Sequence, residues 1–125
     1  MVPNEVTIVG VLQACAHLAT LHQARRIHGY IIRSEFDSNV YVATALIDMY
    51  AKCGRINIAR QLFEKMSTRD VVTWNAMIAG YGMHGYGEDA FASFKRMQLT
   101  GMKPDHITFA FVLCACCHAS LVDDG

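Results

Sequence analysis

The feature that most constrains the fold is an internal repeat, because residues 1–17 recur as residues 102–118 at a constant offset of 101 residues. The residues shared at matching positions are Met1 and Met102, Pro3 and Pro104, Thr7 and Thr108, Val11 and Val112, Leu12 and Leu113, Ala14 and Ala115, Cys15 and Cys116, and His17 and His118. A segment that returns in register predicts an array of similar structural units.

Two shorter periods divide the long one. Residues 43–66 align with residues 74–97 at a shift of 31, and the first unit aligns with the second at a shift of 35. These periods predict units at 5–39, 40–70 and 71–105, with a further, incomplete unit at 106–125 and residues 1–4 as the tail of an earlier one. We therefore expect a piece of a longer array, in which Met1 need not be a native start.

Each unit is predicted to form two antiparallel helices. In the unit at 71–105, two apolar stripes follow helical spacing, formed by Trp74, Met77, Ile78 and Tyr81 and by Ala90, Phe91, Phe94 and Met97. Glycines at 82, 85 and 87 separate the stripes, and Gly101 and Pro104 end the second one. No segment alternates apolar and polar residues as a half-buried strand would. The predicted fold class is therefore all-α, with helix pairs that need neighbours to bury their stripes.

Composition sets further bounds. Hydrophobic residues make up 53% of the 125 residues, which is enough for a core of stacked helices. The formal net charge is zero, so nucleic-acid binding must depend on locally placed basic groups and on base contacts. Five cysteines fit reduced thiols inside a cell or organelle better than a disulfide framework. The apolar run at 107–117 is too short to span a bilayer, and no membrane partner is expected.

The incomplete last unit predicts exposed apolar surface. We expect this surface around Phe109, Phe111, Val112 and Leu113, and with it self-association through the ends of the chain.

The motifs VVTWNAMIAGY, ALIDMYAKCGRINIARQLFEKM and GMKPD, together with the periods, resemble pentatricopeptide repeat (PPR) proteins of the plant PLS class. The resemblance covers the whole chain and implies an α-solenoid of helix-turn-helix repeats with a right-handed superhelix. Its repeat order is long (5–39), short (40–70), standard (71–105) and long again (from 106). Tetratricopeptide repeats are the nearest competitor, but the 31-residue unit and the Asp that closes two units argue against their 34-residue period.

This resemblance implies binding of single-stranded RNA, with about one base read per repeat. The base-selecting residues of the family are the fifth and the last of each repeat, and the apolar second residue packs on the base. Carried over, the readers are Val9 with Asn39, Thr44 with Asp70, Asn75 with Asp105, and Ala110 in the last unit. The corresponding packing residues are Val6, Tyr41, Val72 and Ile107.

The family's code assigns guanine to Thr44 with Asp70 and uracil to Asn75 with Asp105, which predicts a central G-U step. Val9 and Ala110 have no polar side-chain group, so their units should discriminate poorly between bases. The resemblance further implies a specificity factor for C-to-U RNA editing in a mitochondrion or chloroplast. Editing-factor proteins are its expected partners, and its targeting peptide would lie outside this chain.

Other interpretations of the same residues stay open. Asp70 and Asp105 precede a helix and could cap it, while Thr44 and Asn75 could bond to nearby backbone. Stacked helix pairs could also serve as a scaffold for proteins without reading RNA. Cys114, Cys116, Cys117 and His118 invite a zinc site, but residues on one helix point in several directions, and structural zinc usually draws ligands from two segments. No metal, cofactor or catalytic residue is predicted, because no catalytic motif is present.

Overall fold

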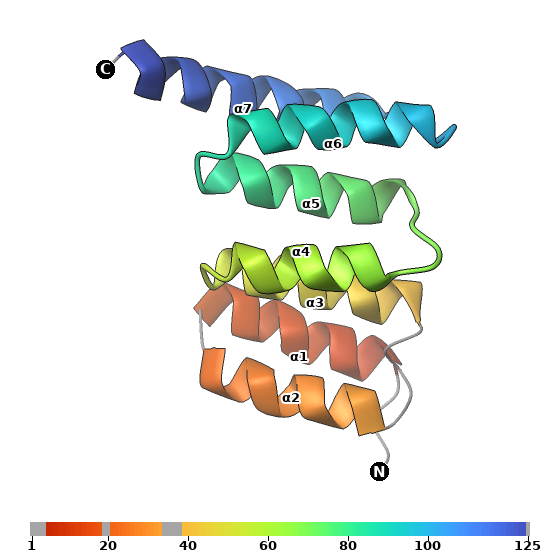
Figure 1. The fold of residues 1–125 in the computed structure, drawn as a ribbon. Helices are drawn as coiled ribbons and strands as arrows, with labels where there is room; N and C mark the ends of the chain where they lie inside the picture. Colours follow the sequence, from red (N-terminus) through yellow and green to blue (C-terminus); the bar gives the residue numbers. More distant parts are fainter. Residues whose placement is uncertain (1–4, 19–20, 34–38, 125) are drawn as a thin grey trace. The chain divides into compact units, whose positions relative to one another are not determined.

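The computed structural model describes residues 5–18, 21–33 and 39–124, with the side chains of residues 5, 21, 24 and 118–124 excepted. Within these ranges the chain forms helices and no strand, which confirms the all-α prediction (Figure 1). The helices are α1 (Glu5–Leu18), α2 (Leu21–Arg33), α3 (Val40–Lys52), α4 (Ile56–Lys65), α5 (Val71–Met83), α6 (Gly87–Leu99) and α7 (His106–Asp124). The predicted tail at residues 1–4 lies outside the described residues.

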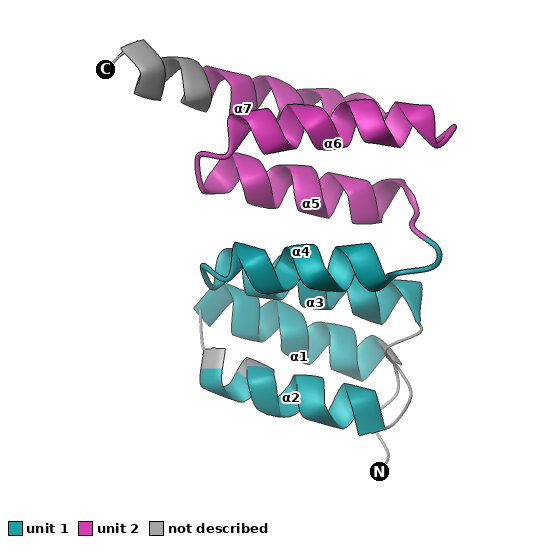
Figure 2. Cartoon of the chain, in the orientation of Figure 1, with its two compact units in different colours: residues 1–68 teal, residues 69–125 magenta. Residues whose placement is uncertain are grey.

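The chain divides into two compact units, residues 1–68 and 69–125 (Figure 2). In unit 1, α1 packs against α2 and α3, and α4 packs against α3. In unit 2, α5, α6 and α7 pack against one another. The odd-numbered helices are called first helices below, because each begins at the first residue of a predicted repeat.

Each unit has its own apolar core. Leu12, Ile31, Ile47 and Phe63 are at most 2% exposed in unit 1. In unit 2 the whole predicted stripe of α5 is buried, and so are Ala90 and Met97 of α6. Phe91 does not belong to this core: it is 41% exposed, and its ring lies against Phe94 and under the Lys95 ammonium group.

The prediction of exposed apolar surface on α7 is right for two of its four residues, whereas Phe111 is half-buried and Val112 is buried. Phe109 is 50% exposed and Leu113 is 66% exposed. Val112 is buried, because it lies on the same face of α7 as the buried Thr108 and Ala115.

The first and second helices of a repeat are joined by the same glycine turn in both units. Gly54 follows α3 and Gly85 follows α5, and each has a φ of 82°. The N–H after each glycine donates to a carbonyl five residues back, from Arg55 to Tyr50 and from Tyr86 to Tyr81, at 2.8 Å in both cases. This is the Schellman closure, which requires a left-handed residue that glycine adopts without steric cost.

The length difference between the predicted short and standard repeats lies in their second halves. First helices α3 and α5 both have 13 residues, whereas α4 has 10 residues and α6 has 13. The connection after α4 (66–70) is one residue shorter than the connection after α6 (100–105). The 31-residue period therefore comes from the loss of most of one turn of the second helix and one loop residue.

A glycine marks the closest approach of two first helices in unit 2. A Cβ atom added at Gly82 of α5 would lie 3.1 Å from the Cβ of Ala115 of α7. The backbones can approach this closely only because both residues are small.

Gly82→Val is expected to destabilise the protein by about 1–3 kcal/mol, because its methyl groups must displace α7. Gly10→Val is the matched control, since Gly10 is also inside a first helix but a Cβ there meets nothing within 4 Å. Urea unfolding followed by circular dichroism measures both variants. Equal loss of stability in the two would contradict the close contact between α5 and α7.

Candidate nucleic-acid interface

An exposed apolar side chain recurs as the second residue of every first helix. The exposed fractions are 74% for Val6, 71% for Tyr41, 63% for Val72 and 43% for Ile107. These are the four residues that the sequence predicts to pack on bases, and they are called the second-position residues below. Single exposed apolar residues are common on protein surfaces, but recurrence at one repeat position indicates a surface that contacts something.

Two second-position residues of unit 1 line one open cavity. This cavity has a volume of about 460 Å³ and is lined by Val6, Val9, Gly10, Gln13 and Tyr41. The four residues of α1 follow i, i+3, i+4, i+7 spacing and therefore share a face of the helix. The predicted reader Val9 thus lies in the same cavity as the packing residues Val6 and Tyr41. The volume falls within the range of roughly 300–1,000 Å³ that is common for ligand sites.

The predicted closing residues Asn39, Asp70 and Asp105 each cap the helix that follows them. In each case the side-chain Oδ1 accepts from the backbone N–H three residues later, at 3.1 Å from Val42, 2.9 Å from Thr73 and 2.9 Å from Thr108. The capping role that the sequence left open for Asp70 and Asp105 is therefore present, and the structure adds the same role for Asn39. It does not exclude base contact, because the carboxylates of Asp70 and Asp105 can accept further bonds at Oδ2 and the amide of Asn39 can donate from Nδ2.

The structure brings the predicted pair Asn75 and Asp105 together. The Asn75 amide Nδ2 donates to Asp105 Oδ1 at 3.2 Å, although the two residues are 30 positions apart. Thr108 joins them: its hydroxyl contacts both Asn75 Oδ1 and Asp105 Oδ1. The side chain of Asn75 therefore bonds to the next repeat. The alternative that the sequence left open, a bond from this side chain to nearby backbone, is not what these contacts show.

Asn75 is also largely buried, with 6% of its surface exposed. The bonds to Asp105 and Thr108 engage one of its two N–H groups and one carbonyl lone pair. A base contact by Asn75 must therefore use the other N–H and the other lone pair at the exposed edge of the amide.

The remaining predicted readers differ in accessibility. Ala110 is exposed, whereas Val9 and Thr44 are half-buried. Thr44 belongs to unit 1 and Asp70 belongs to unit 2. The pairing of Thr44 with Asp70 therefore stays a prediction.

Thr108 is the functional candidate that sequence reasoning missed. The signal was present, because Asp-x-x-Thr occurs at both 70–73 and 105–108. At the first of these, Asp70 N–H donates to Thr73 Oγ1 at 3.4 Å and Thr73 N–H donates to Asp70 Oδ1, which together form a capping box. The contact of Thr108 with Asn75 has no such local signal.

Hydrogen bonds favour the charged form of Asp105. The Thr108 backbone N–H and hydroxyl contribute most, and the Asn75 amide and the neighbouring His106 add to them, so the pKa of Asp105 is lowered despite partial desolvation. The carboxylate is therefore ionised and acts only as an acceptor at neutral pH.

The cysteines do not gather into a site. Cys114, Cys116 and Cys117 are exposed on α7, and Cys15, which matches Cys116 in the repeat, is buried against α2 and α3. Across residues 5–18, 21–33 and 39–124, no three His, Cys, Asp or Glu side chains converge as metal ligands would. The side chain of His118 lies outside the described residues.

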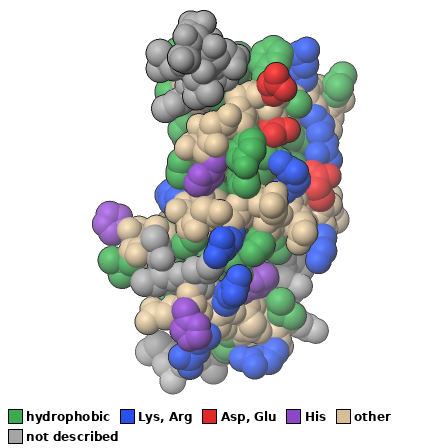
Figure 3. Space-filling model, turned by 60° about the vertical axis from the view of Figure 1, so that its left-hand side comes forward, with side chains coloured by type: hydrophobic (Ala, Val, Ile, Leu, Met, Phe, Trp, Pro, Cys, Tyr) green, Lys and Arg blue, Asp and Glu red, His purple; other side chains and the backbone are tan. Residues whose placement is uncertain are grey.

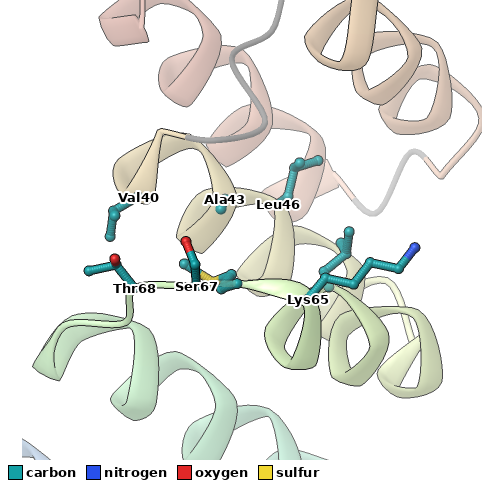
Figure 4. Close-up of a pocket in the computed structure, with 8 residues that line it drawn as sticks. Val40, Ala43, Leu46, Lys65, Ser67 and Thr68 are labelled. Carbon is teal, nitrogen blue, oxygen red and sulfur yellow. The ribbon is translucent and has the colours of Figure 1, made fainter.

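Two other cavities, both in unit 1, contain none of the predicted base readers. One, of about 410 Å³, lies between α3 and the segment after α4, where Val40 and Ala43 face Ser67 and Thr68 (Figure 4). The other, of about 700 Å³, lies between α1 and α2 and has Arg25, Arg26 and Arg33 in its lining. On the face drawn in Figure 3, Lys and Arg side chains are spread over the whole surface, whereas Asp and Glu side chains are seen only in its upper half.

None of the described helices is both long enough and apolar enough to cross a membrane.

The helix pairs, the glycine turns and the recurring positions define an α-helical repeat protein. The profile of the PPR repeat matches residues 41–71, and the profile of the PPR repeat family matches residues 69–118, so the two together cover more than half of the chain. The chain belongs to the pentatricopeptide repeat family.

Its relatives in Arabidopsis thaliana carry the same family name. Pentatricopeptide repeat-containing protein CRR2, chloroplastic, is 49% identical over 98% of this chain and 19% of its own length. A putative pentatricopeptide repeat-containing protein is 47% identical over 98% of this chain and 17% of its own length. A mitochondrial member is 47% identical over 98% of this chain and 14% of its own length. The chain thus spans less than a fifth of the length of each of these relatives.

Asp105→Asn is expected to lower stability at pH 7, because it removes an ionised cap and acceptor. Since the folded pKa of Asp105 is depressed, its contribution is complete above the unfolded pKa and disappears as pH falls through the folded value. The stability difference between parent and variant should therefore shrink below about pH 4. Urea unfolding at pH 7, 4 and 3 measures it, with Glu88→Gln at an exposed position of α6 as the control for the loss of one negative charge. A difference that stays constant with pH would contradict the hydrogen-bonded carboxylate.

Proposed function

We propose that the chain binds single-stranded RNA and reads about one base per repeat, with repeats at 5–39, 40–70, 71–105 and 106–125. The observation that carries this proposal is the exposed apolar side chain at the second position of all four first helices. Folding does not require these residues to be apolar, whereas the stacking of a base requires such a surface. Membership of the PPR family supports the same conclusion.

The order of repeats is long, short, standard and long, as in the PLS class. The unit at 40–70 selects guanine through Thr44 and Asp70, and the unit at 71–105 selects uracil through Asn75 and Asp105. The two long units select weakly, because Val9 and Ala110 offer a base no hydrogen bond. The preferred strand therefore has a G-U step at its centre.

The contacts in unit 2 support a role for Asn75 and Asp105 as one reader. Asn75 supplies a donor and an acceptor at neighbouring atoms, which is the pattern needed to meet the Watson-Crick edge of a base. Asp105 holds that amide by accepting one N–H at 3.2 Å. A side chain that is already held in place loses less entropy when the base arrives.

The chain acts without catalysis, as part of a specificity factor that positions a target cytidine for C-to-U editing by another domain or protein. Its place of action is a mitochondrion or a chloroplast, because relatives are named as mitochondrial or chloroplastic proteins. Editing-factor proteins are its further partners, and exposed Phe109 and Leu113 are available for self-association.

A reciprocal exchange of readers tests base selection. We expect the parent chain to prefer a strand with central G-U, Thr44→Asn to prefer U-U, Asn75→Thr to prefer G-G, and the double variant to prefer U-G. Binding is measured by fluorescence anisotropy at low salt with strands that differ only at these two bases. Preference unchanged by either exchange would overturn base reading. Absence of RNA binding by the folded parent would overturn the RNA function and favour the protein scaffold.

Tyr41→Ala is expected to weaken RNA binding about five-fold or more, since stacking of one base contributes about 1–3 kcal/mol. Its thermal unfolding should change little, because Tyr41 is 71% exposed. Phe91→Ala is the control, as Phe91 is an exposed aromatic residue on the second helix α6. If Phe91→Ala weakened binding as much as Tyr41→Ala, the second-position residues would not be the binding surface.

A further inference from the structure

Thr108 lies where α5, α7 and the segment between α6 and α7 meet. It is the third residue of α7, and it is completely buried. Its hydroxyl lies 2.9 Å from Asp105 Oδ1 and within hydrogen-bond contact of Asn75 Oδ1. The backbone N–H of Asp105 donates to the same hydroxyl at 3.2 Å. One side chain therefore contacts both members of the proposed uracil reader.

The available donors determine how the Asn75 amide is oriented. The ionised carboxylate of Asp105 only accepts, and a threonine hydroxyl has one proton. The amide nitrogen must therefore face Asp105 Oδ1, 3.2 Å away, because an amide oxygen there would meet a second acceptor. The amide oxygen then faces Thr108, and the hydroxyl proton is shared between this oxygen and the carboxylate.

The orientation of an amide determines which pyrimidine it matches. Uracil presents a carbonyl oxygen beside an N–H group on its Watson-Crick edge, whereas cytosine presents an amino group beside a bare ring nitrogen. With one N–H and one lone pair already engaged, the Asn75 amide offers a base one donor and one acceptor, so it pairs with uracil in one orientation and with cytosine when it is turned over. Selectivity for uracil over cytosine therefore requires a contact that prevents the amide group from rotating by 180°.

We propose that Thr108 is a positioning residue for base readout, whose hydroxyl acts together with the Asp105 carboxylate to hold the Asn75 amide in one orientation and so strengthens the preference for uracil over cytosine. This inference rests on the proposed RNA function. The corresponding residue of α3 is Val42, which has no hydroxyl, although Asn39 caps α3 through the backbone N–H of Val42. The first turn of α3 thus has no side-chain hydroxyl at the position that Thr108 occupies in α7.

Thr108→Val tests the role of the hydroxyl with nearly unchanged side-chain size. We expect the ratio of affinities for strands with U and with C at the position read by Asn75 to fall about 3- to 10-fold, the effect of one net hydrogen bond. Thr108→Ser keeps the hydroxyl and should keep the ratio. Thr73→Val makes the same change at the same position of α5 and should leave this ratio unchanged.

A second readout needs no RNA. The side-chain amide signals of Asn75 in a ¹⁵N NMR spectrum should be separated from those of exposed Asn57 and should exchange slowly in the parent and in Thr108→Ser. In Thr108→Val they should move toward the Asn57 signals. Thermal unfolding of each variant establishes that the chain is folded in both experiments.

The outcomes separate this inference from the proposed function. Asn75→Ala should bring the affinities for U and C close to equal. If it does not, or if the folded parent binds no RNA, the base-reading function is overturned. If Asn75→Ala removes the preference while folded Thr108→Val retains it and leaves the Asn75 amide signals in place, base reading stands and the positioning role of Thr108 is overturned.

Discussion

The interaction on which the rest of the structure depends is the side-chain cap before the first helices α3, α5 and α7. Asn39, Asp70 and Asp105 each bond to the backbone N–H three residues later. A cap determines the residue at which a helix begins, and the helical period then determines the faces on which the following residues lie. The second and fifth residues, three positions apart, consequently share a face at every repeat. In unit 2, Asp105 caps α7 and also accepts from the amide of Asn75, the fifth residue of α5.

The packing of the helix pairs stabilises the fold, so the second and fifth residues of each first helix can vary in type. Buried residues of α1, α3 and α5 pack on neighbouring helices, and Gly54 and Gly85 turn the chain back with the same Schellman closure. Variation in repeat length is confined to the second helix and the loop after it, so α3 and α5 keep the same length. A repeat can therefore be shortened without changing the length of its first helix.

Much of the fold could be predicted from the sequence because helical periodicity is local. The stripe of Trp74, Met77, Ile78 and Tyr81 is buried as its spacing predicts. Spacing does not determine how wide a buried face is. Phe91 follows Ala90 by about 100° around α6, so it turns outward and packs on Phe94. Val112 lies on the same face of α7 as Thr108 and is buried with it.

At the candidate site, the cap at Asp105 could be predicted from its position before a helix. The burial of Asn75 and its bond to Thr108, 33 residues away, could not be predicted from the sequence. Both depend on the packing of α5 against α7, which approach each other closely at Gly82.

The central claim is that the first turns of the first helices are the surface on which RNA lies. Photo-crosslinking tests it most directly, with a single strand that carries 4-thiouridine at the central uracil and mass spectrometry to identify the linked residue. The account predicts crosslinks within the first turns of α5 and α7, at or beside Val72 and Ile107. Crosslinks confined to the second helices α2, α4 or α6 would contradict it.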